Sequence, residues 1–454
     1  MSVWVKTHIL TNPHTHTLGL RATARLVPII TTIFEEERER MRMSVFEYVG
    51  GELHAESVSV TQLAESYGTP LYIYSRRTLR EQYAALADAL ADVSPLICYS
   101  VKANSNGAVI REFLDRGAGA DVVSGGELFR ALRAGADPAK IVFAGVGKTR
   151  EEIVYALKEN ILFFTVESES EAMRIEDCAR ETGRIGRIAF RVNPDVDPQT
   201  HQYITTGKKE NKFGLDRERV VQACREAVRL PHVQIVGLHM HIGSQILSAA
   251  PFAEALARVA DLCETIRAFC RDFRYLDLGG GIGIPYQPGE TPLDVADYAG
   301  RMLPLLKKTG LNVVVEPGRF LAGPAGIMVC RVQVVKNNAF KKFIVVDAGM
   351  NDMIRPSLYG AYQDIVAVRE TEDRVFGDVV GPVCESGDFL AKDRDLPAAS
   401  ENDLLVVKDA GAYGFSMASN YNSRPRPAEI MVDGSRVIPI RNRETIEDLV
   451  RNET

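Results

Sequence analysis

The chain has 454 residues, of which 46% are hydrophobic and 25% are charged, and its formal net charge is −6 at pH 7. A chain of this length exceeds one ordinary hydrophobic core, so we expect two or three domains of a globular protein. The acidic balance offers no basic face for nucleic acid, and no apolar run approaches the ~20 residues that cross a bilayer. Neither nucleic acid nor a membrane is an expected partner.

Cysteine usage indicates the compartment. The seven cysteines are odd in number, widely scattered and never arranged as Cys-x-x-Cys: they are Cys98, Cys178, Cys224, Cys263, Cys270, Cys330 and Cys384. This usage argues against a disulfide framework and against a structural zinc site. We therefore expect a reducing, cytoplasmic setting.

The first 42 residues differ from the rest of the chain. They hold an apolar stretch over residues 26–34 and a charge run over residues 35–40, without the basic start and cleavage site of a secretory signal. Because Met41 and Met43 precede the first strand-like pattern, residues 1–42 are predicted to be a disordered extension or a misassigned start. A transit peptide is the weaker alternative.

A hairpin pattern opens the part of the chain that is predicted to fold. The segment FEYVGGELHAESVSV (residues 46–60) reads as two short strands joined at Gly50 and Gly51, and a Gly-Gly pair favours a tight hairpin turn. We expect residues 43–77 to add strands to a β domain that the C-terminal part of the chain builds.

From residue 78 onward, strand-like and helix-like patterns alternate. The eight apolar runs lie at residues 97–101, 120–124, 141–145, 162–166, 188–192, 235–241, 275–279 and 312–316. Amphipathic helix patterns such as residues 149–160 and 216–230 lie between them, so each strand is followed by the crossover that a parallel sheet needs. The pattern predicts an α/β architecture over residues 78–320, a (β/α)8 TIM-type barrel, with a doubly wound open sheet as the alternative.

The chain changes character beyond the barrel pattern. Short strand patterns such as residues 343–350 and 403–409 follow one another without long helices between them. This is typical of an all-β domain, which we assign to residues 321–454.

Polar residues or glycines follow every predicted barrel strand. They include Lys102, Ser124, Glu167, Asn193, His241 with Ser244, Gly279 to Gly281, and Glu316 with Arg319. Reactive groups of such barrels lie at the C-terminal strand ends, although loops are polar in any protein. A lysine, a histidine, three glycines and a glutamate together are more than loops alone would supply.

The lysine and the histidines each allow two interpretations. Lys102, in CYSVKANSN, is either a surface charge or a chemical group at the mouth of a core, since lysine is rarely buried without a partner. His239 and His241 lie on one face of a strand, and this spacing also suits zinc. Outside the N-terminal extension only three other histidines remain and none clusters with them, so no metal site is expected.

Two glycine-containing motifs also allow two interpretations. DLGGGIG (residues 277–283) is either a tight turn or a cradle of backbone N–H groups for a phosphate. EPGR (residues 316–319) is either a charged turn or an acid and an arginine that suit a cationic ring nitrogen and an anion. A lysine, a phosphate cradle, a flat histidine and a carboxylate together describe a site for pyridoxal phosphate.

These motifs resemble one family of enzymes. The chain resembles the diaminopimelate decarboxylases, which are fold-type III pyridoxal phosphate enzymes, from about Phe46 to about Ile440. The resemblance rests on YSVKANSN, GADVVSGGEL, HQYITTGKKENKFG, GLHMHIGSQ, DLGGGIGIPY, EPGRFL, GPVCESGD and DAGAYGFSMASNYNSRPRPAEI. Single motifs are shared with ornithine and arginine decarboxylases, whereas TGKKENKFG, HIGSQ and CESGD together indicate the diaminopimelate branch. The resemblance implies an alanine racemase-like second domain, a β-barrel or β-sandwich.

The resemblance also implies roles for particular residues. Lys102 matches the lysine that holds the cofactor as an imine, and this needs a neutral amine, which desolvation at the barrel mouth favours. Glu316 matches the partner of the pyridine nitrogen, His241 the imidazole that stacks on the ring, and Cys384 the catalytic proton donor. Further cofactor contacts are implied for Ser244, Gly279, Gly280, Gly281, Pro317, Gly318, Arg319 and Tyr413, and substrate contacts for Arg319, Arg355, Tyr359, Glu385 and Tyr413.

The implied activity is decarboxylation of meso-2,6-diaminopimelate to L-lysine and CO2. In the family Cys384 and Glu385 would reach the site from a partner subunit, so the resemblance implies a homodimer with shared active sites. One alternative is a decarboxylase of another basic amino acid, such as ornithine or arginine. The other is a catalytically silent relative, which could lose Lys102 or Cys384, although both are present.

Overall fold

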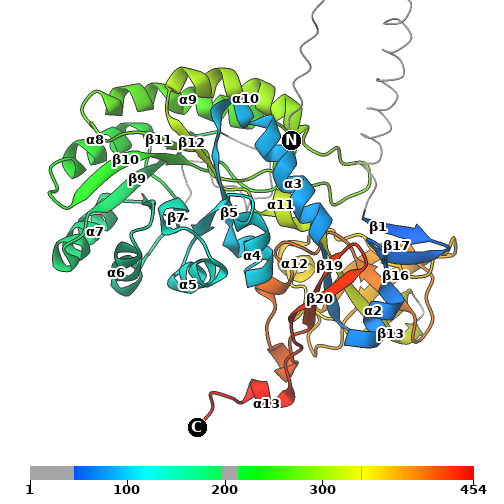
Figure 1. Ribbon diagram of the computed structural model, residues 1–454. Helices are drawn as coiled ribbons and strands as arrows, with labels where there is room; N and C mark the ends of the chain where they lie inside the picture. The colour runs from blue at the N-terminus through cyan, green and yellow to red at the C-terminus, as the bar shows by residue number, and fades with distance from the viewer. Residues whose placement is uncertain (1–44, 197–212, 339) are drawn as a thin grey trace, which may run out of the picture.

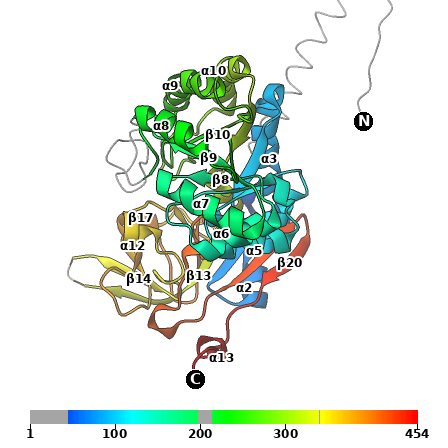
Figure 2. The same cartoon turned by 90° about the vertical axis from the view of Figure 1, so that its left-hand side faces the viewer.

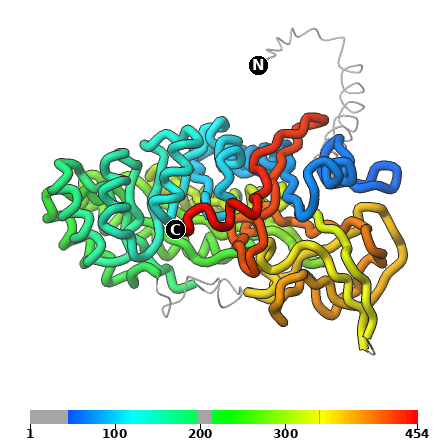
Figure 3. The backbone as a smooth tube through the Cα atoms, turned by 90° about the horizontal axis from the view of Figure 1, so that it is seen from below, coloured from blue at the N-terminus to red at the C-terminus, as the bar shows by residue number. Residues whose placement is uncertain are grey.

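The computed structural model describes residues 45–196, 213–338 and 340–454 (Figure 1). These residues form a barrel of strands and helices, at the upper left of Figure 1, and a separate mixed sheet at the lower right. Figure 2 shows the barrel above the mixed sheet, and Figure 3 shows the two parts side by side from below. The predicted extension at residues 1–42 and most of the motif at residues 201–214 lie outside the described residues.

Eight parallel strands close the barrel in the order β10-β11-β12-β5-β6-β7-β8-β9. They are β5 (Leu96–Ser100), β6 (Gly119–Val122), β7 (Ile141–Phe143), β8 (Phe163–Val166), β9 (Gly186–Val192), β10 (Val233–Met240), β11 (Tyr275–Asp277) and β12 (Asn312–Val315). Each overlaps a predicted strand, because parallel strands that are buried on both faces are continuous apolar runs. The closed ring confirms the predicted barrel, and the open-sheet alternative is wrong.

Helices alternate with the barrel strands along the chain and cover the ring, beginning with α3, which precedes β5. They are α3 (Arg76–Ala89), α4 (Gly107–Leu114), α5 (Gly125–Ala134), α6 (Arg150–Glu159), α7 (Glu169–Thr182), α8 (Arg217–Ala227), α9 (Ala250–Arg267) and α10 (Val295–Thr309). All except α9 begin at a Ser, Thr, Asn or Asp whose side chain accepts a hydrogen bond from a backbone N–H of the first turn. Over the described ranges, no helix combines the length and the apolar character that crossing a membrane would require.

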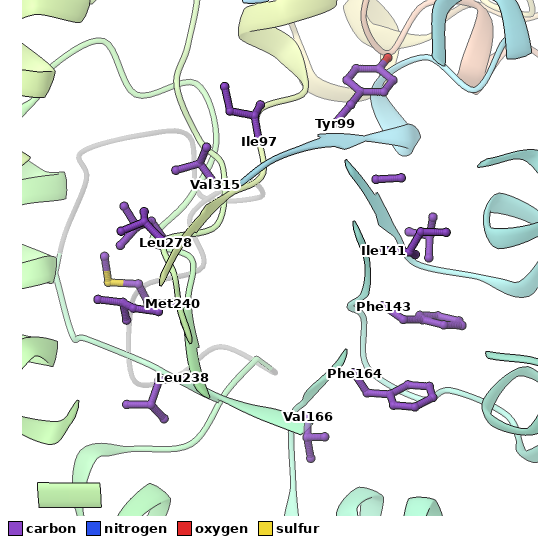
Figure 4. Close-up of a cluster of buried hydrophobic side chains, with 14 of the residues drawn as sticks. Ile97, Tyr99, Ile141, Phe143, Phe164, Val166, Leu238, Met240, Leu278 and Val315 are labelled. Atoms are coloured by element: carbon purple, nitrogen blue, oxygen red, sulfur yellow. The ribbon is translucent and has the colours of Figure 1, made fainter. Parts of the chain in front are cut away.

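The barrel strands alternate their side chains between two apolar environments. Outward side chains such as Ile97, Phe143 and Leu238 point away from the ring toward the helices (Figure 4). A smaller cluster fills the inside of the ring and consists of Cys98, Val142, Phe163, Ala189, Val236 and Val314. A slip of one residue in any strand would exchange the two faces, so this pattern fixes the register of the barrel.

The interior of the barrel becomes polar toward the C-terminal strand ends. The buried polar residues of this layer include Ser100, Asp121, Arg191, His239, Asp277 and Glu316. Every second side chain of a barrel strand points into the ring. Ser100, two residues beyond Cys98 on β5, therefore points inward as Cys98 does. Charged residues are rarely buried without partners, and the layer therefore marks the floor of a site.

A mixed sheet of nine strands forms the second domain, as the predicted fold class requires. Its strands are β4 (Leu71–Ser75), β13 (Gly326–Asn337), β14 (Lys342–Val346), β15 (Ile365–Ala367), β16 (Arg374–Val380), β17 (Phe389–Pro397), β18 (Leu404–Val407), β19 (Ala428–Asp433) and β20 (Arg436–Arg441). The N-terminal strand β4 pairs with both β13 and β19, so residues from both ends of the described chain share this sheet. The predicted boundary at residue 320 falls between the last barrel strand β12 and β13.

The predicted N-terminal hairpin is present in a small separate sheet. It contains β1 (Phe46–Val49), β2 (Glu52–Ala55) and β3 (Val58–Ser59). Gly50 and Gly51 join β1 to β2 with φ values of +62° and +81°, which a tight hairpin turn requires and glycine adopts without strain. The described residues also form the short α-helices α2 (Val60–Tyr67), α11 (Arg319–Ala322), α12 (Arg355–Tyr359) and α13 (Ile446–Leu449).

A buried carboxylate joins the mixed sheet to the barrel. Glu429, on β19, is fully buried and accepts hydrogen bonds from the Tyr74 hydroxyl at 2.7 Å and from Asn106 Nδ2 at 2.9 Å. Asn106 is the N-cap of barrel helix α4, and Arg441 of β20 also pairs with Glu429. One side chain therefore connects three strands of the sheet to a helix of the barrel.

Replacement of Glu429 by leucine is expected to lower the free energy of unfolding by about 2–5 kcal/mol, since each buried donor left without an acceptor costs roughly 1–3 kcal/mol. Urea denaturation measures the loss. Glu429→Gln is the matched control, because its amide oxygen still accepts a hydrogen bond. Its free energy of unfolding should fall by less than that of Glu429→Leu. Equal stability of Glu429→Leu and the unmodified protein would contradict the assigned role.

Candidate active site

A cavity of about 600 Å³ opens at the C-terminal end of the barrel, where the mixed sheet domain meets it. Its lining includes seven of the predicted site residues: Lys102, His241, Ser244, Arg319, Arg355, Tyr359 and Tyr413. The first four follow barrel strands β5, β10 and β12, whereas the last three come from α12 and from the segment after β18. Residues up to 311 positions apart in the sequence thus meet around one space, because both domains contribute to it.

Lys102 lies one turn beyond β5 and is held by a buried acid. Its Nζ contacts Asp121 Oδ2 at 2.8 Å, and the same oxygen accepts a hydrogen bond from the Ser100 hydroxyl at 2.6 Å. Burial alone would lower the pKa of Lys102, but the charge of Asp121, with Tyr413 and Glu316, raises it above its ordinary value. Desolvation thus favours the neutral amine as expected, but the carboxylate that the neighbouring strand supplies outweighs it.

His241 presents a neutral imidazole to the cavity. Burial first, and then the nearby charges of Arg191 and Lys102, lower its pKa well below the ordinary value. Its Nδ1 accepts a hydrogen bond from the Gly280 N–H at 3.2 Å, which places the ring proton on Nε2. A neutral, oriented ring is suited to pack against a flat aromatic group.

The three glycines after β11 form a cradle that side chains would fill. Gly279 and Gly281 have φ values of +65° and +114°, a region that strains other residues. A Cβ on Gly280 would lie 2.2 Å from the backbone oxygen of Glu316, and one on Gly279 would lie 2.9 Å from Nδ1 of His241. Only glycine allows the backbone to approach this closely, as a phosphate cradle requires.

Glu316 lies at the floor of the site, at the end of β12. It is 4% exposed, and its Oε2 accepts a hydrogen bond from Nε2 of His239 at 3.2 Å. Burial would raise its pKa, but His239 and Lys102 lower it to about 2, so the carboxylate stays anionic. A carboxylate can accept about four hydrogen bonds, so Glu316 retains acceptor sites for a cationic ring nitrogen.

Pro317 and Gly318 form the turn that carries Glu316 and Arg319. The Pro317 carbonyl accepts a hydrogen bond from the Ser100 N–H at 3.1 Å. A Cβ on Gly318 would lie 3.0 Å from the Cβ atoms of Ser100 and Ala103. The turn thus packs closely against the β5 end that carries Lys102.

Two arginines share Tyr286 in the same cavity. Arg319 donates to the Tyr286 hydroxyl at 2.8 Å and to the Ser244 hydroxyl at 3.2 Å, and its guanidinium lies 4.7 Å from the centre of the Tyr413 ring. The guanidinium of Arg355 lies 4.4 Å from the centre of the Tyr286 ring and donates to Gln363. Neither arginine forms an ion pair with a carboxylate in the part of the chain that the structure describes, and Nε of each is buried without a hydrogen-bond acceptor there.

Cys384 and Glu385 do not line this cavity. They lie in the segment between β16 and β17, and Cys384 is exposed, unlike the other six cysteines. The Cys384 N–H donates to Asn422 Oδ1 at 2.7 Å, which fixes the backbone but leaves the thiol at the surface. The role of these two residues in a partner subunit's site stays a prediction.

Two residues of the site were missed from the sequence. Asp121 lies within the strand of GADVVSGGEL, and its direction into the barrel follows only once its pairing with Ser100 in the β5–β6 register is known. Tyr286 ends DLGGGIGIPY, where an aromatic ring after a glycine run was a usable but weak signal. Both became visible only when the closed ring placed them beside Lys102 and Arg319.

The residues present fit a pyridoxal group. The glycine cradle is open where side chains would block it, and an anionic carboxylate lies at the floor. A neutral imidazole and a lysine line the wall between them. Such groups suit a phosphate, a ring nitrogen, a ring face and an aldehyde carbon in turn.

Comparison with known proteins agrees with this fit. A family model described as "Pyridoxal-dependent decarboxylase, pyridoxal binding domain" matches residues 76–323. The diaminopimelate decarboxylase of Pseudomonas aeruginosa is 47% identical over 414 residues, which cover 91% of this chain and 99% of that protein. The diaminopimelate decarboxylase of Aquifex aeolicus is also 47% identical, over 89% of this chain and 96% of that protein.

A solved structure gives the same result. The crystal structure of the diaminopimelate decarboxylase from Helicobacter pylori complexed with L-lysine has a TM-score of 0.83 and 42% sequence identity. The match covers 87% of this chain and 98% of that chain. Sequence and fold agree over nearly the whole length of these relatives, and the chain therefore belongs to the diaminopimelate decarboxylase family of pyridoxal-dependent decarboxylases.

Proposed function

We propose that this chain catalyses the pyridoxal phosphate-dependent decarboxylation of meso-2,6-diaminopimelate to L-lysine and CO2, the last step of lysine biosynthesis. The observation that carries the proposal is the pair of buried arginines, Arg319 and Arg355, in the cavity that Lys102 lines. A substrate with a second carboxylate gives such cations an anionic partner. The family to which the chain belongs supports the same reaction.

The cofactor would be held by residues from several strand ends. Lys102 would carry it covalently, the Gly279–Gly281 cradle with Ser244 and Tyr413 would hold its phosphate, and His241 would lie on the ring face. Glu316 would pair with the ring nitrogen and keep it protonated. When bound, the pyridoxal group accepts the electron pair that remains when the α-carboxylate leaves as CO2.

Asp121 controls the proton of Lys102. The ammonium must lose a proton before the amine can bond to a carbon, and Asp121 Oδ2 is 2.8 Å from Nζ. Burial first, and then the negative charge of Glu316, raise the pKa of Asp121 above its ordinary value, which makes this carboxylate a better base. Asp121 thus serves as the acceptor of the lysine proton.

The distal end of the substrate would meet Arg355, with Tyr359 beside it on α12. Arg319 bonds to Ser244 and so lies nearer to the phosphate cradle, where it can serve the cofactor as well as the substrate. Ornithine and arginine lack a distal carboxylate, so the alternative substrates would leave Arg355 buried without an anion, which is costly. The presence of Lys102 and Cys384 argues against the silent relative.

Two further parts of the proposal concern assembly and compartment. The exposed position of Cys384, away from the cavity of its own chain, suits delivery to a partner's site in a homodimer. Its thiol would return a proton to the α-carbon of a substrate bound in the partner subunit, whose own Lys102 holds the cofactor. The expected cytoplasmic setting agrees with a reduced thiol at the surface.

Purified protein is expected to turn over meso-diaminopimelate and neither ornithine nor L-lysine. Arg355→Met should lower kcat/KM for meso-diaminopimelate by about 10²-fold, the upper range for losing a hydrogen bond between charged groups. Release of CO2 measures the rate for each substrate. Arg301→Met, on the outer surface of α10, removes an exposed arginine and is the matched control. A preference of the unmodified protein for ornithine would overturn the substrate assignment.

A further inference from the structure

Three buried ionisable side chains meet beneath the proposed cofactor site. His239, Asp277 and Glu316 come from the neighbouring strands β10 and β11 and from the end of β12, and all three are at most 4% exposed. His239 and Asp277 are direct partners in the β10–β11 pairing. Nitrogen or oxygen atoms of the three side chains all lie within 4.8 Å of one another. Each side chain is thus within reach of the others and away from solvent.

The hydrogen bonds of this group leave two carboxylate oxygens unmatched. Asp277 Oδ1 accepts from the Gly279 N–H at 2.9 Å, and Glu316 Oε2 accepts from His239 Nε2 at 3.2 Å. Asp277 Oδ2 and Glu316 Oε1 are buried and have no hydrogen-bond partner among the described residues. Two buried carboxylates whose oxygens lie within 4.8 Å of each other repel when both are ionised, whereas one proton on the pair supplies a hydrogen-bond donor.

The proton belongs on Asp277. Burial first, and then the charge of Glu316, raise the pKa of Asp277 well above its ordinary value. The pKa of Glu316 is lowered to about 2, because the effects of His239 and Lys102 exceed that of burial. These opposite shifts separate a neutral acid from an anion in one pair of carboxyl groups, as paired catalytic acids do elsewhere.

The tautomer of His239 follows from the same hydrogen-bond count. Its Nδ1 is buried without a partner among the described residues, and an N–H there would be an unpaired donor. A proton on Nε2 instead donates to Glu316. The ring therefore carries a proton on Nε2, where Glu316 accepts it.

We propose that neutral Asp277 and the Nε2–H of His239 both donate hydrogen bonds to the Glu316 carboxylate, and so orient it and hold it anionic for the cofactor's ring nitrogen. The two are positioning residues, since they act through Glu316. The identity of the cofactor ring in this inference rests on the proposed function. The proton that Asp277 donates to Glu316 does not depend on that function. The same three side chains have the donor set of a metal site, and that alternative makes a different prediction.

Asp277→Asn and Asp277→Leu separate a donor role from packing. Asparagine keeps an oxygen for the Gly279 N–H and offers an N–H to Glu316, so Asp277→Asn should lose less than about tenfold in kcat/KM. Leucine has a similar size but no donor, so Asp277→Leu should lose about 10- to 100-fold, as for a hydrogen bond to a charged group. His239→Gln and His239→Leu should show the same contrast.

Two spectroscopic readouts test the network in the holoenzyme. Infrared spectra should contain a carboxylic acid C=O band that shifts in D2O and is missing from Asp277→Asn. Asp352 is the matched control, because burial raises its pKa to about 7, so its band should vanish at alkaline pH while that of Asp277 persists. The 15N shift of labelled cofactor should report a protonated ring nitrogen in the unmodified protein and in Asp277→Asn, and loss of that proton in Asp277→Leu.

The network would be overturned if no carboxylic acid band can be assigned to Asp277, or if Asp277→Asn and Asp277→Leu lower kcat/KM equally. It would also be overturned if the protein binds one divalent cation per chain and Asp277→Asn releases that cation. The infrared measurement on the unmodified protein needs no variant and stands even if a variant fails to fold. Turnover of meso-diaminopimelate by the same preparation tests the proposed function separately. An inactive protein with the Asp277 band would contradict the reaction but keep the network.

Discussion

Lys102→Ala is expected to abolish the absorbance of the lysine-bound cofactor and to lower kcat by more than about 10⁴-fold, because covalent attachment and proton transfer by one amine are lost together. The fold should remain, since Lys102 lies beyond the end of β5 and contacts Asp121 rather than the apolar core. The absorbance spectrum of the purified variant measures the loss of the lysine-bound cofactor, and an assay of CO2 release measures the loss of kcat. Lys140→Ala, which removes a lysine that bonds only to a backbone carbonyl at the surface, is the control.

The variant also has a structural consequence that needs its own control. Without Lys102, the Ser100 hydroxyl is the one side-chain donor that the fully buried Asp121 keeps among the described residues. If Lys102→Ala is poorly folded, the double variant with Asp121→Asn should restore folding without restoring turnover. A borohydride-reducible adduct of Lys102→Ala at another lysine would show that the assigned lysine is wrong.

The barrel was predictable because its strands are buried on both faces. Each predicted run matches a strand, and the runs extend one or two residues beyond most strand ends, into the residues that form the site. His241, Glu316 and the three glycines were found by the rule that barrel sites lie at C-terminal strand ends. Position along one strand was enough to identify them.

The charge of Lys102 was not predictable in the same way. Its pKa depends on Asp121, which lies on the neighbouring strand and pairs with Ser100 in the β5–β6 register. A pattern along the chain gives burial, which lowers the pKa of a lysine, but not the partner across the sheet that raises it. The network of His239, Asp277 and Glu316 has the same origin, since it joins three strands that the sequence separates by up to 77 residues.

The proposal that Cys384 acts in a second chain's site is tested by co-expression of two inactive variants. If Cys384 acts from one subunit and Lys102 from the other, Lys102→Ala and Cys384→Ala are each nearly inactive alone. Cys384→Ala should keep a small remaining activity, because losing a proton donor typically lowers the rate by about 10²- to 10⁴-fold when water replaces the donor. Their mixed dimer nevertheless contains one site with both Lys102 and Cys384.

Random pairing makes half of the dimers mixed, and each mixed dimer has one working site of two, so activity should recover to about a quarter of that of the unmodified protein. The subunits must be able to exchange, which is why the two chains are co-expressed with different affinity tags and the doubly tagged dimer is isolated. That purified species should have about half of the unmodified activity. Activity no greater than the sum of the two parents would place both residues in the same subunit's site. The decarboxylase assignment would then stand, but the reason for an obligatory dimer would be lost.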